Sequence, residues 1–210
     1  MVYVLSAYSG AYSLPGILRD YEKYFPESYI TKAKRYAFEE DACHFLLGKV
    51  LLLKGIRKLG YFDLGLHDMR FNEFNKPYFN NNLSFNISHS GKYVVCAISQ
   101  TCKLGIDLEE AKAIDIDSLS NCFSENEWSY LKNADDPLLA FYKLWTRKEA
   151  VIKADGRGLQ IPLSCFEVID HRASLNSCDW FIYEMKIAVG YIAHIATDRM
   201  CDNHSFQLLI

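Results

Sequence analysis

Apolar residues follow two different periods in the first part of the chain. Residues 2 to 8, VYVLSAY, are rich in branched and aromatic side chains, which predicts a first strand. From Phe38 to Leu59 the apolar residues recur at helical spacing, with acidic side chains in the first turns and basic ones near the end. Because this order of charge complements the helix dipole, the segment is predicted to form a long helix.

The pattern changes to short β-type segments between residues 67 and 109. The segments LSFNISHS, KYVVCAIS and KLGIDLE are rich in strand-forming residues. Turn residues such as Ser90 and Gly91 separate them. This order predicts a hairpin followed by another strand.

A second long helix is predicted from Pro137 to Asp155. Asp135 or Asp136 can cap its first turn, and Pro137 suits the first helical position. Gly156 suits its C-terminal end, because glycine readily adopts the left-handed conformation found there. Three further strands are predicted after this helix, in the segments CFEVID, WFIYEMKIA and GYIAHIA.

Strand, helix and strands thus follow one another twice along the chain. The sequence contains no low-complexity linker and no close internal repeat. We therefore predict an α/β protein in which two similar halves form one compact unit. The halves are expected to comprise residues 1–101 and 102–210, and to meet near Gln100 to Lys103.

The composition is that of an ordinary globular protein. The 210 residues are 50% apolar and 14% aromatic, so disorder is not expected. The seven cysteines are an odd number without a CxxC pair, which favours neither a zinc site nor a complete disulfide framework. We expect reduced thiols, several of them in the core.

Charge and hydropathy argue against two classes of partner. A formal net charge of -3 provides no basic excess for binding nucleic acid, so any anion site must be local. No basic leader precedes an apolar run, and no apolar segment approaches the roughly 20 residues that span a bilayer. We expect a soluble, cytoplasmic protein without a nucleic-acid or membrane partner.

Two carboxylates share one face of the strand predicted at KLGIDLE. Side chains alternate along a strand, so Asp107 and Glu109 point one way while Ile106 and Leu108 point the other. The simplest interpretation is a strand whose polar face lies in water. The alternative is that the two acids belong to a functional site.

The second long helix carries a stripe of residues that bears on this choice. Trp145, Glu149 and Lys153 are spaced four apart and lie on one face. Glu149 and Lys153 can form an ordinary solvated pair; if the stripe faces the strand instead, three carboxylates converge beside an amine. Such a cluster needs a cation, since like charges at close range raise each other's pKa. Oxygen-only ligands favour Mg²⁺, which also binds phosphates, so the cluster would imply a phosphate-bearing substrate.

The two patterns resemble those of a known family, the Sfp-type 4'-phosphopantetheinyl transferases. The family pattern of Gly, an aliphatic residue, Asp, any residue and Glu is found from Gly105 to Glu109. The pattern of Trp, two variable residues, Lys, Glu, three residues and Lys is found from Trp145 to Lys153. Gly156, Gly158 and Leu159 follow it. Either pattern alone is moderately specific, whereas the pair in this order, about 40 residues apart, is strong.

Three other segments extend the resemblance to about residues 30 to 165. NKPYF is similar to the family's Lys-Pro element, with Asn75 where Gly is usual. FNISHSGKYVVCAIS resembles its Ser-His hairpin, and RYAFEEDACHFLLGKVLL resembles the helix of its first half. The length resembles the two-halved type, which implies halves related by a pseudo-twofold axis and a monomer whose single chain supplies a complete site.

The resemblance implies a reaction. Members of the family move the phosphopantetheine arm of coenzyme A to a serine hydroxyl of an apo acyl or peptidyl carrier protein and release adenosine 3',5'-bisphosphate. By resemblance, Asp107, Glu109 and Glu149 hold Mg²⁺ against the diphosphate of coenzyme A. Glu149 and Lys153 are the implied catalytic residues. Lys153 offsets charge on the phosphoryl oxygens, and Glu149 accepts the serine proton directly or through a metal-bound water.

The resemblance also implies that the first half binds coenzyme A. Relatives commonly carry an Arg in the first-half helix, where this chain has Ala42, Cys43 and His44. Selectivity for the 3'-phosphate is therefore expected to be weaker than usual, because His is largely neutral at pH 7. The residues expected to bind coenzyme A are Lys32, Arg35, His44, Lys76, Ser88 and His89.

Two other functions remain open at this point. One is a catalytically silent module that binds coenzyme A or a carrier protein, although all three candidate metal ligands and the lysine are present. The other is a Mg²⁺-dependent hydrolase or nucleotidyl transferase, and the sequence lacks both GxxxxGK[ST] and GxSxG, two common signatures of such enzymes. Carrier proteins are typically acidic, so docking on this slightly acidic chain would depend on a local basic or apolar patch.

Overall fold

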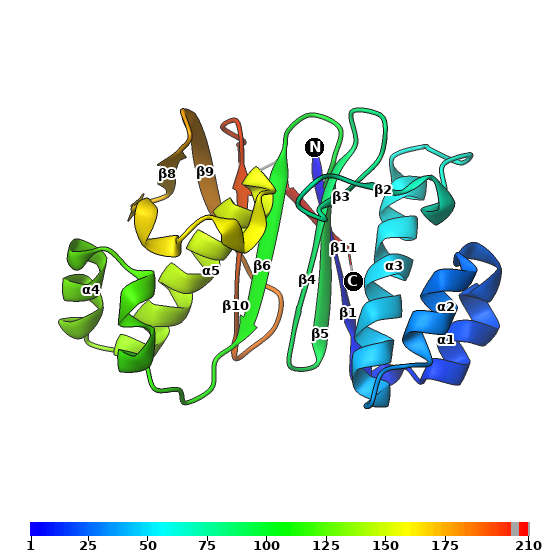
Figure 1. The fold of residues 1–210 in the computed structure, drawn as a ribbon, viewed down its shortest axis with the longest axis horizontal. Helices are drawn as coiled ribbons and strands as arrows, with labels where there is room; N and C mark the ends of the chain where they lie inside the picture. Colours follow the sequence, from blue (N-terminus) through cyan, green and yellow to red (C-terminus); the bar gives the residue numbers. More distant parts are fainter. Residues whose placement is uncertain (203–205, 210) are drawn as a thin grey trace. The chain divides into compact units, whose positions relative to one another are not determined.

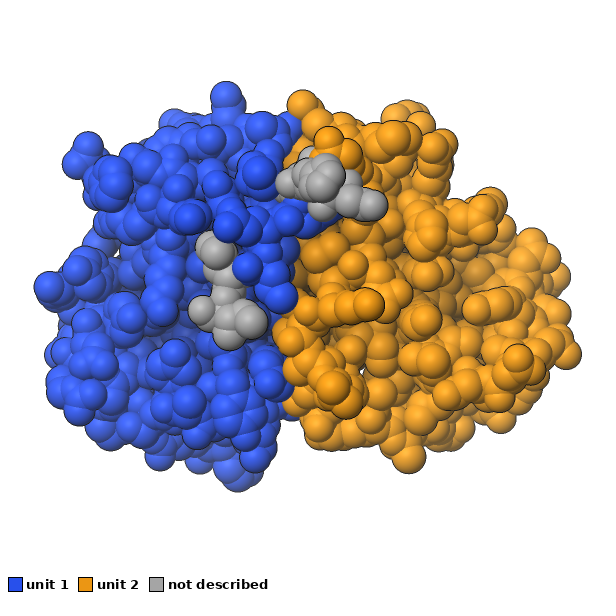
Figure 2. Space-filling view, turned by 180° about the vertical axis from the view of Figure 1, so that it is seen from behind, with its two compact units in different colours: residues 1–101, 204–210 blue, residues 102–203 orange. Residues whose placement is uncertain are grey.

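The computed structural model describes residues 1–202 and 206–209. The chain divides between Thr101 and Cys102 into two compact units, coloured blue and orange in Figure 2. Unit 1 contains residues 1–101 and the C-terminal strand β11 (Phe206–Leu209), and unit 2 contains residues 102–202. The sequence predicted no strand at these residues and assigned residues 102–210 to the second half, whereas the structure pairs β11 in parallel with β1 (Val2–Tyr8) of unit 1.

The sheet of unit 1 has the strand order β11-β1-β5-β4. The strands β4 (Ser84–Ser90) and β5 (Tyr93–Ser99) form the hairpin that the sequence predicts, and β5 also pairs antiparallel with β1. A separate short hairpin joins β2 (Arg70–Phe71) to β3 (Pro77–Tyr78). The predicted first strand is confirmed at its predicted bounds.

A long helix, α3 (Glu39–Lys58), lies along this sheet and confirms the helix predicted from the first apolar period (Figure 1). Its buried face packs on the sheet in the core of unit 1. The short helices α1 (Leu14–Tyr21) and α2 (Glu27–Ala33) pack against α3, and the sequence did not predict them. Each has at most eight residues, too few for a clear period. Single 3₁₀ turns occur at Ser9–Ala11, Glu22–Tyr24 and Leu66–Asp68.

The sheet of unit 2 has the strand order β6-β10-β9-β8-β7, and the neighbouring strands run antiparallel. Its strands are β6 (Leu104–Glu110), β7 (Val168–Ile169), β8 (Arg172–Leu175), β9 (Cys178–Met185) and β10 (Tyr191–Thr197). The sequence predicts all of them except β8. Asn176 and Ser177 join β8 to β9 with φ values of 52° and 61°. Left-handed residues at both positions of a two-residue loop are typical of tight hairpins, and this turn signal was missed.

The second long helix, α5 (Pro137–Asp155), packs against β6 and β10 and has the bounds that the sequence predicts (Figure 1). The Asp136 side chain accepts a hydrogen bond from the Leu139 backbone, and Gly156 ends the helix with a φ of 93°. A shorter helix, α4 (Glu125–Lys132), begins with a capping box made by Ser124 and Glu127. Further 3₁₀ segments lie at Asp117–Cys122, Gly158–Gln160 and Leu163–Cys165.

These helices and sheets confirm the α/β class, whereas the pseudo-twofold relation between the halves stays a prediction. All seven cysteines are free thiols, and Cys43, Cys96 and Cys102 are buried, as expected for core residues. Burial raises the pKa of the Cys96 thiol to about 12. Over the described residues, no helix combines the length and the apolar character needed to cross a membrane.

Candidate functional site

Strand β6 and helix α5 come very close to each other at Gly105. A Cβ atom on this residue would lie 2.3 Å from the carbonyl oxygen of Ala150 and 2.3 Å from the backbone nitrogen of Ala154. Because side chains alternate along a strand, Asp107 and Glu109 lie on the same face as Gly105, which α5 covers. Asp107 is only 3% exposed. The interpretation of a polar strand face in open water is therefore wrong for Asp107.

We expect Gly105→Ala to destabilise the protein by about 2 kcal/mol or more. The added methyl group would overlap backbone atoms of α5, which cannot turn away as the end of a flexible side chain can. Gly65→Ala is the matched control, because the nearest atom to its added Cβ is Asp68 Oδ2 at 3.9 Å. Urea unfolding of both variants measures the difference. A Gly105→Ala protein as stable as the control would mean that strand and helix need no such close approach.

Lys153 on α5 reaches across to Asp107 on β6. Its Nζ donates a hydrogen bond to Asp107 Oδ1 at 2.5 Å, and the lysine side chain is 28% exposed. Of the two interpretations of the α5 stripe, the structure thus supports the one in which the stripe faces the strand. The lysine neutralises one carboxylate at this position and keeps a path to solvent.

Glu149, one turn before Lys153, belongs to the same cluster. Burial raises the pKa of the Glu149 carboxyl, and the charges of Asp107 and Glu109 raise it further, while Lys153 acts in the opposite direction. Asp107 and Glu109 are therefore near enough to Glu149 to repel its charge. This is the electrostatic conflict that the sequence predicts.

The chemistry of this cluster fits a hard divalent cation. The donors are carboxylate oxygens, which Mg²⁺ prefers, and their mutual repulsion would be relieved by a positive ion. In the described part of the chain, no three Asp, Glu, His or Cys side chains already stand in the arrangement of a metal site. The lysine occupies the place of counter-ion to Asp107 instead. The roles of Asp107, Glu109 and Glu149 as metal ligands stay predictions.

A buried ion pair joins Lys148 of α5 to Glu127 of α4, and the sequence did not reveal it. Lys148 Nζ contacts both carboxylate oxygens of Glu127, at 2.8 and 2.6 Å, and the Phe166 carbonyl at 2.6 Å. Glu127 Oε1 also accepts a hydrogen bond from the Val168 backbone at 3.0 Å. Burial lowers the pKa of Lys148, whereas its bond to Glu127 raises it. The pair ties α5 to α4 and to the start of β7.

In unit 1 the structure brings together His44 on α3 and His89 on β4. Their rings stack with centroids 5.1 Å apart, and His44 Nε2 lies 3.0 Å from the Ser9 hydroxyl. Both histidines line a cavity of about 320 Å³ between α3 and β4, together with Tyr36, Asn86 and Lys49. Two of the residues expected to bind coenzyme A thus share one cavity.

The other residues expected to bind coenzyme A are more dispersed. Lys32 is exposed, with its Nζ 4.8 Å from the centre of the Phe45 ring, which lines the same cavity. Arg35 is also exposed, and Ser88 is buried on β4. The described lining of the cavity includes none of Arg35, Lys76 and Ser88.

The Lys-Pro element is held by a tight turn. The Lys76 backbone donates a hydrogen bond to Asn72 Oδ1 at 2.8 Å. Asn75, which stands where the family usually has Gly, has a φ of 61°. Asn is one of the few residues besides Gly that adopt this left-handed conformation at low cost, so the replacement preserves the turn.

Lys49 is a candidate ligand-binding residue that the sequence analysis missed. It lines the cavity of His44 and His89, and its Nζ lies 5.5 Å from the Phe45 ring centre. Burial lowers the pKa of Lys49, and the nearby Lys32 lowers it too. A lysine within the apolar run LLGKVLLL is the signal that could have identified it.

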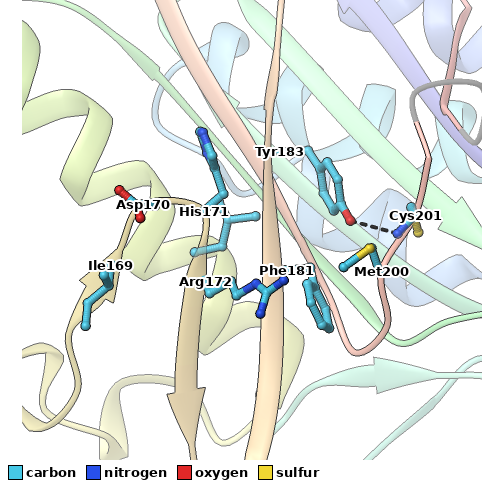
Figure 3. Close-up of a pocket in the computed structure, with 9 residues that line it drawn as sticks. Ile169, Asp170, His171, Arg172, Phe181, Tyr183, Met200 and Cys201 are labelled. Atoms are coloured by element: carbon cyan, nitrogen blue, oxygen red, sulfur yellow. Dashed lines mark hydrogen bonds between the residues drawn. The ribbon is translucent and has the colours of Figure 1, made fainter.

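A larger cavity of about 660 Å³ lies in unit 2, and Figure 3 shows the residues that line it. It lies between the β7–β8 turn with His171, the start of β8 at Arg172, and the segment at Met200 and Cys201. The Tyr183 hydroxyl closes one side by accepting a hydrogen bond from the Cys201 backbone at 2.7 Å. The described lining of this cavity contains none of the residues predicted for the site.

Comparison with known proteins gives a consistent result for both units. Residues 103–199 match the model of the 4'-phosphopantetheinyl transferase superfamily, and residues 21–101 match that of the 4'-phosphopantetheinyl transferase N-terminal region. The 4'-phosphopantetheinyl transferase ffp of Bacillus subtilis is 39% identical over 181 residues, which are 80% of this chain and 80% of the relative. The chain belongs to the 4'-phosphopantetheinyl transferase superfamily.

Two further members of the superfamily are similar over a shorter region. The 4'-phosphopantetheinyl transferase Sfp of Bacillus subtilis (strain 168) is 39% identical over 147 residues, or 67% of this chain and 64% of the relative. The 4'-phosphopantetheinyl transferase gsp of Aneurinibacillus migulanus is 38% identical over 149 residues, or 68% of this chain and 62% of the relative. The chain therefore covers slightly less than two thirds of the length of these two relatives.

The family resemblance inferred from the sequence is thereby confirmed. The candidate residues of this phosphopantetheinyl transferase relative divide between the two matched regions. The carboxylate cluster with Lys153 lies in the superfamily match, and the histidine cavity lies in the match to the N-terminal region. Each region thus carries one of the two groups of residues singled out above.

Proposed function

We propose that the protein transfers the 4'-phosphopantetheine arm of coenzyme A to a serine hydroxyl of an apo acyl or peptidyl carrier protein. The reaction requires Mg²⁺ and releases adenosine 3',5'-bisphosphate. The observation that carries the proposal is the cluster between β6 and α5, in which Lys153 binds the buried Asp107 beside Glu149. In a chain of this family, such a cluster suits a reaction at a diphosphate.

The carboxylates of Asp107, Glu109 and Glu149 would hold the cation. When bound, Mg²⁺ would supply positive charge to the phosphoryl oxygens of the diphosphate. Lys153 is partly exposed and can donate hydrogen bonds to phosphoryl oxygens when it leaves Asp107. Lys153 would then exchange one partner, the Asp107 carboxylate, for another, the phosphoryl oxygens of the substrate.

Glu149 is the proposed acceptor of the serine proton. As the bond from the serine oxygen to the β-phosphorus forms, the bond from that phosphorus to the leaving bisphosphate breaks, and the hydroxyl proton passes to the Glu149 carboxylate. Glu149 and Lys153 are thus the proposed catalytic residues.

Unit 1 is proposed to bind coenzyme A. The cavity with His44 and His89 offers polar groups and the ammonium of Lys49 to a phosphate. Lys32, Arg35, Lys76 and Ser88 are the further residues proposed for this role. We also propose that the protein acts as a cytoplasmic monomer, and that the carboxylates and the α5 lysine of unit 2 carry the chemistry.

Intact-protein mass spectrometry tests the proposed reaction. A panel of apo carrier proteins is incubated with the protein, coenzyme A and Mg²⁺, with and without a chelator. We expect a gain of one phosphopantetheine mass on at least one carrier, and no gain with the chelator. No gain on any carrier, for a protein shown by calorimetry to bind coenzyme A, would instead support a silent binding module.

A further inference from the structure

His194 on β10 lies next to the proposed metal site, and the roles assigned above do not involve it. It is fully buried and pairs in register with Asp107 on β6. Residues directly opposite each other on antiparallel strands project on the same face, so His194 and Asp107 both point to the side that α5 covers. Because buried polar groups are almost always hydrogen-bonded, the partners of this ring indicate what it does.

Both ring nitrogens of His194 contact side chains of α5. Nδ1 lies 2.7 Å from Thr146 Oγ1, and Arg147 Nε donates to Nε2 at 3.3 Å. A guanidinium has only donors, so Nε2 accepts and the ring proton is on Nδ1. Thr146 Oγ1 accepts that proton and donates its own to the Tyr142 carbonyl at 2.7 Å. The neutral ring with its proton on Nδ1 satisfies every one of these bonds.

The surroundings of His194 keep the ring neutral. Burial first, and then the charges of Arg147, Lys143 and His171, lower the pKa of His194 to about 3. A protonated ring would also present a second donor to the guanidinium of Arg147. His194 is therefore a fixed connection between β10 and α5 and does not carry protons.

This connection and the contact at Gly105 lie on either side of Glu149. Thr146 precedes Glu149 by about one turn of α5, and Gly105 contacts the helix at Ala150 and Ala154. Gly105 allows α5 to approach β6 but has no side chain that could stop the helix from sliding or rotating. The bond from His194 to Thr146 adds a directional contact between β10 and α5, as the Lys153–Asp107 bond does between β6 and α5, and Figure 1 shows α5 lying along both strands.

We propose that His194 is a positioning residue: together with Thr146 it fixes the rotation of α5 on the sheet, so that Glu149 is aimed at Asp107. The inference rests on the proposed function, because the two carboxylates act together only as ligands of the same cation. His194 itself touches neither substrate nor cation.

Binding of Mn²⁺ to the protein without coenzyme A, measured by electron paramagnetic resonance, tests this inference. We expect His194→Leu and Thr146→Val to weaken Mn²⁺ binding about tenfold, the order found when residues that orient metal ligands are removed. His194→Asn keeps an N–H group near the position of Nδ1 and is expected to restore most of the affinity. Thr146→Val preserves the shape of the side chain, so it decides the question if His194→Leu does not fold.

Ile195→Val is the matched control. Ile195 is equally buried in β10 but points to the opposite face, so this variant loses packing without touching α5. Thermal unfolding is recorded for each variant.

The inference is overturned if His194→Leu and Thr146→Val bind Mn²⁺ as tightly as the wild type, or if Ile195→Val weakens binding as much. A wild-type protein that transfers phosphopantetheine but binds no Mn²⁺ would overturn the shared-cation role, and the positioning role with it. Failure of transfer alone would overturn only the proposed reaction.

Discussion

Asp107→Asn is expected to lower the rate of phosphopantetheine transfer at least about a hundredfold, in a protein that still folds. The substitution preserves shape but removes the buried charge that pairs with Lys153 and is proposed to hold the cation. Glu109→Gln and Glu149→Gln are expected to have effects of the same order, since each removes one carboxylate from the cluster. The measurement is kcat/KM with an apo carrier protein, coenzyme A and saturating Mg²⁺.

Glu110→Gln is the matched control for these variants. Glu110 is the next residue of β6 but lies on its other face, where it pairs with Lys112 Nζ at 2.6 Å. Removing this partly exposed pair is expected to leave transfer nearly unchanged. Calorimetric titration with coenzyme A shows whether each variant still binds its substrate. Full activity of Asp107→Asn would remove Asp107 from the proposed ligands. If Glu110→Gln lost as much transfer activity as Asp107→Asn, the losses would reflect general damage to β6 and not the removal of a metal ligand.

Lys148→Met is expected to reduce the free energy of unfolding by about 3–5 kcal/mol. Lys148 is fully buried and Glu127 is 6% exposed, so the substitution leaves a buried carboxylate without its ammonium partner. The Glu127 hydrogen bond from Val168 compensates only part of that loss. Urea unfolding followed by circular dichroism measures the change.

The double variant Lys148→Met/Glu127→Leu separates the missing charge from the lost packing. Replacing both partners by apolar residues of similar size is expected to recover most of the stability, because no unpaired charge stays buried. The exposed pair of Lys132 and Asp117, at 2.9 Å, gives a comparison, since Lys132→Met is expected to cost less than about 1 kcal/mol. Equal stability of Lys148→Met and the wild type would contradict the assignment of the pair as a structural element.

The sequence alone predicted the strand and the helix that carry the candidate site, β6 and α5. The period of two in KLGIDLE and the period of four in the α5 stripe place Asp107, Glu149 and Lys153 on definite faces of their elements. Those periods do not tell whether the two faces meet. The contact at Gly105 settles that question, because only a strand residue without a side chain lets the helix backbone come so close.

Other features depend on contacts between distant parts of the chain. Lys148 and Glu127 are 21 residues apart, and each has a local explanation, one in the helix pattern and the other in the capping box of α4. Lys49 lies in an apolar run, where only the cavity reveals its surroundings. None of these three residues stands out by its spacing, so the sequence patterns did not predict their contacts.

The pairing of β11 with β1 means that unit 2 is an insertion within unit 1. During synthesis on the ribosome, β1 emerges about 200 residues before its partner β11, and about 100 of the residues between them belong to unit 2. Unit 2 is continuous and can be completed before the sheet of unit 1 has all its strands. Until then, the outer edge of β1 has unpaired backbone groups that other nascent chains can bind. Strand β11 therefore protects an edge of a strand that was synthesised about 200 residues earlier.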